Sequence, residues 1–124
     1  MAQTVMVVED HAMTRTGLTL ILQRHGYEVI AADNGRTALE LLTAGTSPDV
    51  ILLDMLMPQL DGWQLLKRLQ GTSSGDIPVI IATGTILTRE WAEEQKCAGF
   101  LKKPIEERDL LDELRTVLPP TTAA

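Results

Sequence analysis

Charged and hydroxyl side chains follow the most apolar runs of this chain. Glu9 and Asp10 come directly after one run, Asp54 follows a second, and Thr83 follows a third. Lys103 follows a shorter segment and precedes a proline. If these runs are strands of one parallel sheet, their carboxyl ends meet at one edge. The residue types then place three carboxylates, one hydroxyl and one ammonium around a single crevice.

Three carboxylates in one crevice need a cation, a lysine or a proton to offset their repulsion. Two unit charges about 4 Å apart repel by about 4 kcal/mol at an effective dielectric of 20. Oxygen ligands in an open crevice suit Mg²⁺, which keeps several waters and takes a few carboxylates together with a phosphate. Taken alone, an acid such as Asp10 after a strand most often caps the next helix. The joint occurrence favours a carboxylate–metal site that handles a phosphoryl group.

Other chemistries typical of α/β sheets have no motif in this sequence. The phosphate-binding pattern G-x-x-x-x-G-K-[ST] and the dinucleotide pattern G-x-G-x-x-G are both absent. A flavin-phosphate loop would need Ser, Thr or Gly where residues 9–11 are Glu-Asp-His. The single cysteine, Cys97, has no histidine nearby in the sequence, so a thiol hydrolase is not indicated.

The elements that must position these residues alternate between strands and helices. Continuous apolar runs predict buried strands, and apolar spacing of three and four predicts helices. Helix 88–97 is mostly polar, so we expect it to be marginal and loosely packed. The alternation predicts a parallel sheet with right-handed crossovers and helices on both faces. The strands are expected at 5–8, 27–32, 50–53, 79–82 and 99–102, and the helices at 12–24, 36–44, 63–70, 88–97 and 107–118.

Length and composition fit one small domain. The chain has 124 residues, with 17 acids against 11 bases and a formal net charge of -6. This balance disfavours direct binding to nucleic acid or to anionic membranes. One cysteine, no apolar run of about 18 residues and no signal segment predict a cytoplasmic protein. We expect the domain to span 1–118, followed by a frayed tail at 119–124.

The motifs together resemble the receiver domain of two-component response regulators. The resemblance covers residues 4–118 and implies a flavodoxin-like, doubly wound α/β fold. Its sheet would have five parallel strands in the order 2-1-3-4-5, with five helices. The residues that carry it are 7–10 with Arg15, 52–58 with 61–62, 77–84 and 100–104.

This resemblance implies an acceptor and a metal. Asp54 would be the phosphoacceptor, attacking the phosphohistidine of a histidine kinase and forming an aspartyl phosphate. Asp10 and Asp54 would bind Mg²⁺ (or Mn²⁺) directly, with the main-chain carbonyl of Leu56 as a third ligand. Glu9, where the family more commonly has Asp, would reach the metal through a water.

The resemblance also implies how the phosphoryl group is held and sensed. Lys103 would pair with Asp54 at rest and with a phosphoryl oxygen afterwards, across a cis bond to Pro104. Thr83 would donate its hydroxyl to another phosphoryl oxygen. Phe100 would turn into the space that Thr83 leaves, remodelling the face formed by residues 88–118. The simpler interpretation is that Phe100 is an ordinary core residue.

Several functional alternatives stay open at this point. The resemblance implies a phosphoacceptor that assists its own phosphotransfer and dephosphorylation, rather than an enzyme. Partners would be a histidine kinase or phosphotransfer domain and a downstream target or output domain, with dimerisation through face 88–118 left open. A receiver-like interaction module without phosphorylation is the alternative. An aspartate-nucleophile phosphatase would need an acid where Leu56 stands. The Met1 start favours an N-terminal or stand-alone receiver.

Overall fold

A five-stranded parallel sheet forms the centre of the protein. The computed structural model describes residues 2–55, 62–70, 72–84 and 86–118. Within these residues the strand order is β2-β1-β3-β4-β5, which confirms the predicted order. The strands are β1 (Thr4–Val8), β2 (Glu28–Ala32), β3 (Val50–Asp54), β4 (Val79–Thr83) and β5 (Gly99–Lys102).

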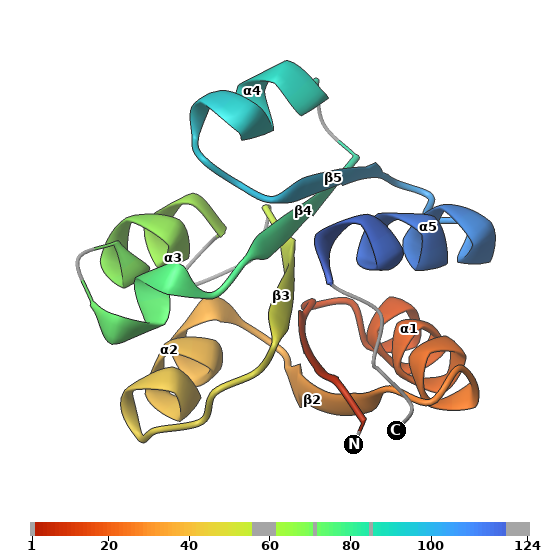
Figure 1. Cartoon of the computed structure of the whole chain (residues 1–124), viewed down its shortest axis with the longest axis horizontal. Helices are drawn as coiled ribbons and strands as arrows, with labels where there is room; N and C mark the ends of the chain where they lie inside the picture. The colour runs from red at the N-terminus through yellow and green to blue at the C-terminus, as the bar shows by residue number, and fades with distance from the viewer. Residues whose placement is uncertain (1, 56–61, 71, 85, 119–124) are drawn as a thin grey trace.

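Helices cover both faces of the sheet, as the strand–helix alternation predicted. Figure 1 shows α1 and α5 on one face and α2, α3 and α4 on the other. None of the helices in the described ranges is long and apolar enough to cross a membrane. The helices are α1 (Ala12–Arg24), α2 (Gly35–Thr43), α3 (Gly62–Leu69), α4 (Arg89–Glu94) and α5 (Glu107–Val117), with a 3₁₀ turn at Ser73–Asp76 between α3 and β4.

Two apolar layers hold the helices against the sheet. Successive residues of a strand point to opposite faces, so the continuous apolar runs of β1, β3 and β4 supply both layers. On one face the core includes Leu22 of α1 and Leu110 of α5, both fully buried. On the other face it includes Leu42 of α2 and Leu65 of α3. Each fully buried leucine contributes about 1.5–3 kcal/mol.

The strand register brings the polar strand ends to one edge of the sheet. Val8 pairs with Leu53, so the residues that follow them, Glu9 and Asp54, leave β1 and β3 at the same level. On the other side of β3, Asp54 pairs with Ala82 of β4. The register of the buried strands therefore decides where the acidic side chains meet.

Helix α4 is the shortest α-helix in the described ranges, with six residues. The Thr88 hydroxyl accepts a hydrogen bond from the Trp91 amide at 3.1 Å and caps its start. Just beyond its end, Lys96 has a φ of 64°, a left-handed conformation that a non-glycine residue adopts uncommonly. This agrees with the expectation that segment 88–97 forms only a marginal helix. Ala92 is its only buried residue.

Candidate functional site

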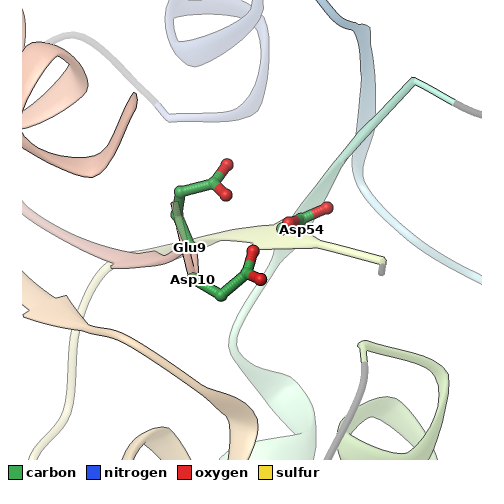
Figure 2. A group of neighbouring side chains, drawn as sticks. All are labelled: Glu9, Asp10 and Asp54. Atoms are coloured by element: carbon green, nitrogen blue, oxygen red, sulfur yellow. The ribbon is translucent and has the colours of Figure 1, made fainter. Parts of the chain in front are cut away.

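The structure brings together the three acids that the sequence placed at strand ends. Ligand oxygens of Glu9, Asp10 and Asp54 all lie within 4.8 Å of one another. Glu9 is 2% exposed and Asp54 is 6% exposed, whereas Asp10 is open to solvent. Figure 2 shows the Asp10 and Asp54 carboxylates approaching each other beside the end of β1. Because like charges repel at this separation, the cluster suits a divalent cation bound from the solvent side.

Lys103 supplies a positive charge to this cluster. Its Nζ lies 2.6 Å from Glu9 Oε1 and 3.3 Å from Asp54 Oδ2. The expected pair with Asp54 is present, but the contact with Glu9 is shorter. Burial alone would lower the pKa of the Lys103 ammonium, but the hydrogen bond to Glu9 and the charge of Asp54 raise it instead. The Lys103–Pro104 peptide bond is cis, as predicted.

Main-chain contacts at the end of β1 hold the acid pair in place. The Arg15 guanidinium donates from Nη1 to the carbonyl oxygens of Glu9, at 2.9 Å, and of Asp10, at 3.4 Å. Helix α1 is capped by the side chain of His11, which accepts a hydrogen bond from the Thr14 amide. Asp10 is therefore not the N-cap of α1, and the simpler interpretation of Asp10 as a helix cap is wrong. The sequence marked Arg15 only as part of a motif, because its carbonyl contacts have no periodic signal.

A close approach of α3 to the end of β3 shapes the crevice beside Asp54. A Cβ atom added at Gly62 would lie 2.6 Å from the carbonyl oxygen of Asp54 and 2.7 Å from Cα of Met55. Any larger residue would push the start of α3 away from the strand that carries Asp54. Leu56, whose carbonyl was expected to bind the metal, lies outside the described residues, so that ligand stays a prediction.

The two predicted switch residues lie on neighbouring strands. Thr83 ends β4 and is 1% exposed, and it pairs with Lys102 of β5. Phe100 of β5 is 9% exposed and belongs to the same core cluster as Ile81 and Ala92. Phe100 is thus a core residue in this structure. Its movement on phosphorylation stays a prediction.

The fold and this site together define a class of protein that binds its ligand at the carboxyl ends of parallel strands. The sequence matches the family model described as "Response regulator receiver domain" over residues 5–115. The chain therefore belongs to the response regulator receiver domain family. Its function is that of a receiver domain of two-component signalling, and the alternative of a module that signals without phosphorylation is not favoured.

Curated relatives differ in how much of their length this chain spans. The chain is 33% identical over 117 residues to the protein PilH of Pseudomonas aeruginosa, covering 92% of this chain and 96% of PilH. It is 33% identical over 120 residues to the response regulator MprA of Mycolicibacterium vanbaalenii, covering 95% of this chain. That match spans only 51% of MprA, so this chain corresponds to about half of that relative.

Solved structures show the same architecture. The chemotaxis protein CheY4 of Vibrio cholerae superposes with a TM-score of 0.85 at 29% identity, covering 95% of this chain and all of CheY4. The receiver domain of a signal transduction histidine kinase from Syntrophus aciditrophicus gives a TM-score of 0.84 at 31% identity. That match covers 99% of this chain and 95% of the other. The fold is thus shared with receivers from different protein contexts.

Proposed function

We propose that the chain accepts a phosphoryl group on Asp54 from a histidine kinase or a phosphotransfer domain. A carboxylate oxygen of Asp54 attacks the phosphorus of a phosphohistidine, the P–N bond breaks, and the imidazole leaves and takes up a proton. The observation that carries this proposal is the meeting of Glu9, Asp10 and Asp54 with the Lys103 ammonium. The receiver family supports the same reaction.

The donor set fits Mg²⁺ or Mn²⁺. Asp10 and Asp54 would bind the cation directly, together with the main-chain carbonyl of Leu56. Glu9 already uses Oε1 for Lys103 and Oε2 for the amide of His11 at 3.1 Å, which supports its indirect contact through a water. When bound, the cation offsets the negative charge of the acceptor and of the phosphoryl group.

The chain's own residues complete the cradle of the phosphoryl group. The Lys103 ammonium lies next to Asp54 Oδ2. When a phosphoryl group is bound to that carboxylate, the ammonium can pair with one of the phosphoryl oxygens. The Thr83 hydroxyl would donate to a second oxygen. Its displacement would let Phe100 shift and change the face formed by α4, β5 and α5. These residues make the chain a phosphoacceptor that assists its own phosphotransfer and dephosphorylation.

An apolar surface beside the crevice fits the phosphoryl donor. Met13 and Leu20 on α1 are 80% and 56% exposed. A neighbouring groove between α1 and the segment after β5 includes Ile21, Lys103 and Ile105. A donor helix packed here would hold its phosphohistidine near Asp54. A single cysteine cannot form an intrachain disulfide, which fits the reducing cytoplasm. The net charge of -6 favours a protein target or output domain over direct binding to nucleic acid.

The test is phosphorylation with phosphoramidate or acetyl phosphate and Mg²⁺, followed by intact mass measurement. The wild-type chain should gain the mass of one phosphoryl group, and Asp54→Asn should gain none. Asp33→Asn is a matched control, because Asp33 also follows a strand, β2, but lies outside the acidic cluster. No gain with any donor would favour the non-phosphorylated module. A gain that persists in Asp54→Asn would place the acceptor elsewhere.

A further inference from the structure

The outer edge of strand β5 is covered by two side chains. β5 is the last strand of the sheet, so one side of it has no strand partner among the described residues. The Phe100 amide donates to Glu113 Oε2 at 2.8 Å, and the Phe100 carbonyl accepts from Arg89 Nη2 at 3.1 Å. The edge carbonyl of Phe100 is thus bound by a side chain of α4, and its edge N–H by a side chain of α5.

The two covering side chains also bind each other. Arg89 Nη1 lies 2.9 Å from Glu113 Oε2, and Arg89 Nη2 lies 3.1 Å from Glu113 Oε1. This is the bidentate geometry in which a guanidinium binds a carboxylate most strongly. Burial alone would raise the pKa of the Glu113 carboxyl, but the hydrogen bonds from Arg89 and from Phe100 lower it. The Glu113 side chain is 12% exposed, whereas the Arg89 side chain is 53% exposed, so the carboxylate is shielded from solvent and the guanidinium is partly hydrated.

The backbone of β5 leaves room for this contact. A Cβ atom added at Gly99 would lie 2.6 Å from Glu113 Oε2, so a larger residue would drive the carboxylate away from the strand. We call the group formed by Arg89, Glu113 and the main chain of Phe100 the α4 latch. It joins α4, β5 and α5 through four hydrogen bonds within one small group.

Helix α4 depends on few contacts, and the latch holds its first residue. Six residues are too few to form a stable helix alone, so tertiary contacts must hold α4 in place. On its other side, the Trp91 ring lies 5.7 Å from the ring of Trp63 on α3. Of the six residues of α4, only Ala92 is buried. A change in the latch is therefore expected to change the position or stability of the whole helix.

We propose that Arg89 and Glu113 are positioning residues for the phosphorylation switch, and that opening the α4 latch is a step in changing the output face. The proposal rests on the proposed function, because it takes Phe100 and α4 as elements that respond to Asp54. A contact made in only one of two arrangements biases the equilibrium toward that arrangement. Removing the latch lowers the cost of moving α4, and by linkage it favours phosphorylation in return.

The experiment uses the whole chain with Arg89→Gln and Glu113→Gln, and Arg89→Lys as the conservative variant. Glu107→Gln is the matched control, because Glu107 also lies on α5 but pairs with Arg24 and His25 of the α1 end. The Phe100 amide exchange rate reports the latch directly. The only two tryptophans, Trp63 and Trp91, report α4 through fluorescence. The rate of phosphorylation by phosphoramidate reports the coupling to Asp54.

The two glutamine variants should exchange the Phe100 amide about tenfold faster than wild type. They should take up the phosphoryl group about fivefold faster, because the arrangement that accepts it is more populated. Their fluorescence change on phosphorylation should be smaller, with Arg89→Lys in between and Glu107→Gln like wild type. If the Phe100 amide exchanged faster while the phosphorylation rate and the fluorescence change stayed at wild-type values, the pair would be merely structural and the proposal overturned. An unchanged exchange rate of the Phe100 amide would also overturn it. A wild-type chain that takes up no phosphoryl group would overturn the proposed function and the latch together.

Discussion

The acidic crevice and the α4 latch each combine buried carboxylates with a positively charged side chain, but their charges balance differently. In the crevice, the carboxylates of Glu9, Asp10 and Asp54 face the single ammonium of Lys103. In the latch, one carboxylate meets one guanidinium, and the remaining hydrogen bonds go to the main-chain N–H and C=O of Phe100 in β5. The crevice therefore has an excess of negative charge, whereas the charges of the latch cancel.

This difference separates a ligand site from a mechanical contact. A group whose charges already cancel has little to gain from a bound ion. A cluster with unbalanced carboxylates gains free energy when a cation binds. The crevice is thus suited to take up a metal and a phosphoryl group. The latch is suited to hold two helices and a strand in one arrangement until another interaction opens it.

The largest effect is expected from Lys103→Met, which removes the ammonium group from the crevice. The variant leaves Glu9 and Asp54 close together without the ammonium between them and removes the group that would hold a phosphoryl oxygen. We expect phosphorylation by phosphoramidate to slow by about 100-fold or more, as for the loss of one charge-stabilising group at a reacting centre. Stopped-flow tryptophan fluorescence or intact mass over time measures this rate.

Lys102→Met is the matched control for that experiment. Lys102 directly precedes Lys103 and is the last residue of β5, but its side chain is exposed and is not part of the crevice. Its rate should stay within about twofold of wild type. Equal slowing of both variants would show that general charge, rather than the contact of Lys103 with Asp54, governs the reaction.

The fold could be predicted from the sequence because it depends on local patterns. Buried parallel strands have continuous apolar runs, so β1, β3 and β4 were placed to within one residue at each end. The acids were placed correctly because the ends of parallel strands meet at one edge. The limits of α1 also agreed, since Gly26, with a φ of 88°, ends the helix as its position suggested.

The pair of Lys103 with Asp54 was expected only from the family resemblance. The other side-chain pairings could not be predicted, because they depend on side-chain reach across distant elements. Lys103 lies closer to Glu9 than to Asp54, and the extra methylene of a glutamate contributes to that reach. The latch joins Arg89 to Glu113, which are 24 residues apart, and it gives no periodic signal. Gly99 offers the one local hint, since a glycine inside a strand often marks a close approach.

An intermediate effect is expected when Mg²⁺ is added to the folded chain. A ligand that binds only the native state stabilises it by about 2.7 kcal/mol at 100 times its dissociation constant. Wild type should therefore unfold at higher denaturant concentration in saturating MgCl₂. Without metal, Asp10→Asn should be more stable than wild type by about 0.5 kcal/mol, because one of three repelling charges is gone. It should also lose most of the gain from MgCl₂.

Asp33→Asn serves as the control, because it removes an acid outside the cluster, and it should respond to MgCl₂ as wild type does. NaCl at matched ionic strength separates specific binding from screening. If Asp10→Asn kept the full stabilisation by Mg²⁺, the crevice would not be the site of the metal.

The smallest effect concerns the latch and depends on pH. The Glu113 carboxyl has a pKa below its ordinary value of 4.5, so the folded state favours its ionised form. The latch therefore contributes stability above pH 4.5, and this contribution is lost as the pH falls through the lowered pKa. Glu113→Gln should reduce the free energy of unfolding by on the order of 1 kcal/mol at pH 7. Urea unfolding at several pH values should show this difference in the free energy of unfolding closing below pH 4.5.

The control is Asp112→Asn, which removes an exposed pair with Arg115 and should show a smaller difference from wild type at pH 7. A gap for Glu113→Gln that stayed constant down to the acid limit of folding would show that the ionised carboxylate contributes nothing. In that case shape alone would hold α4 against β5.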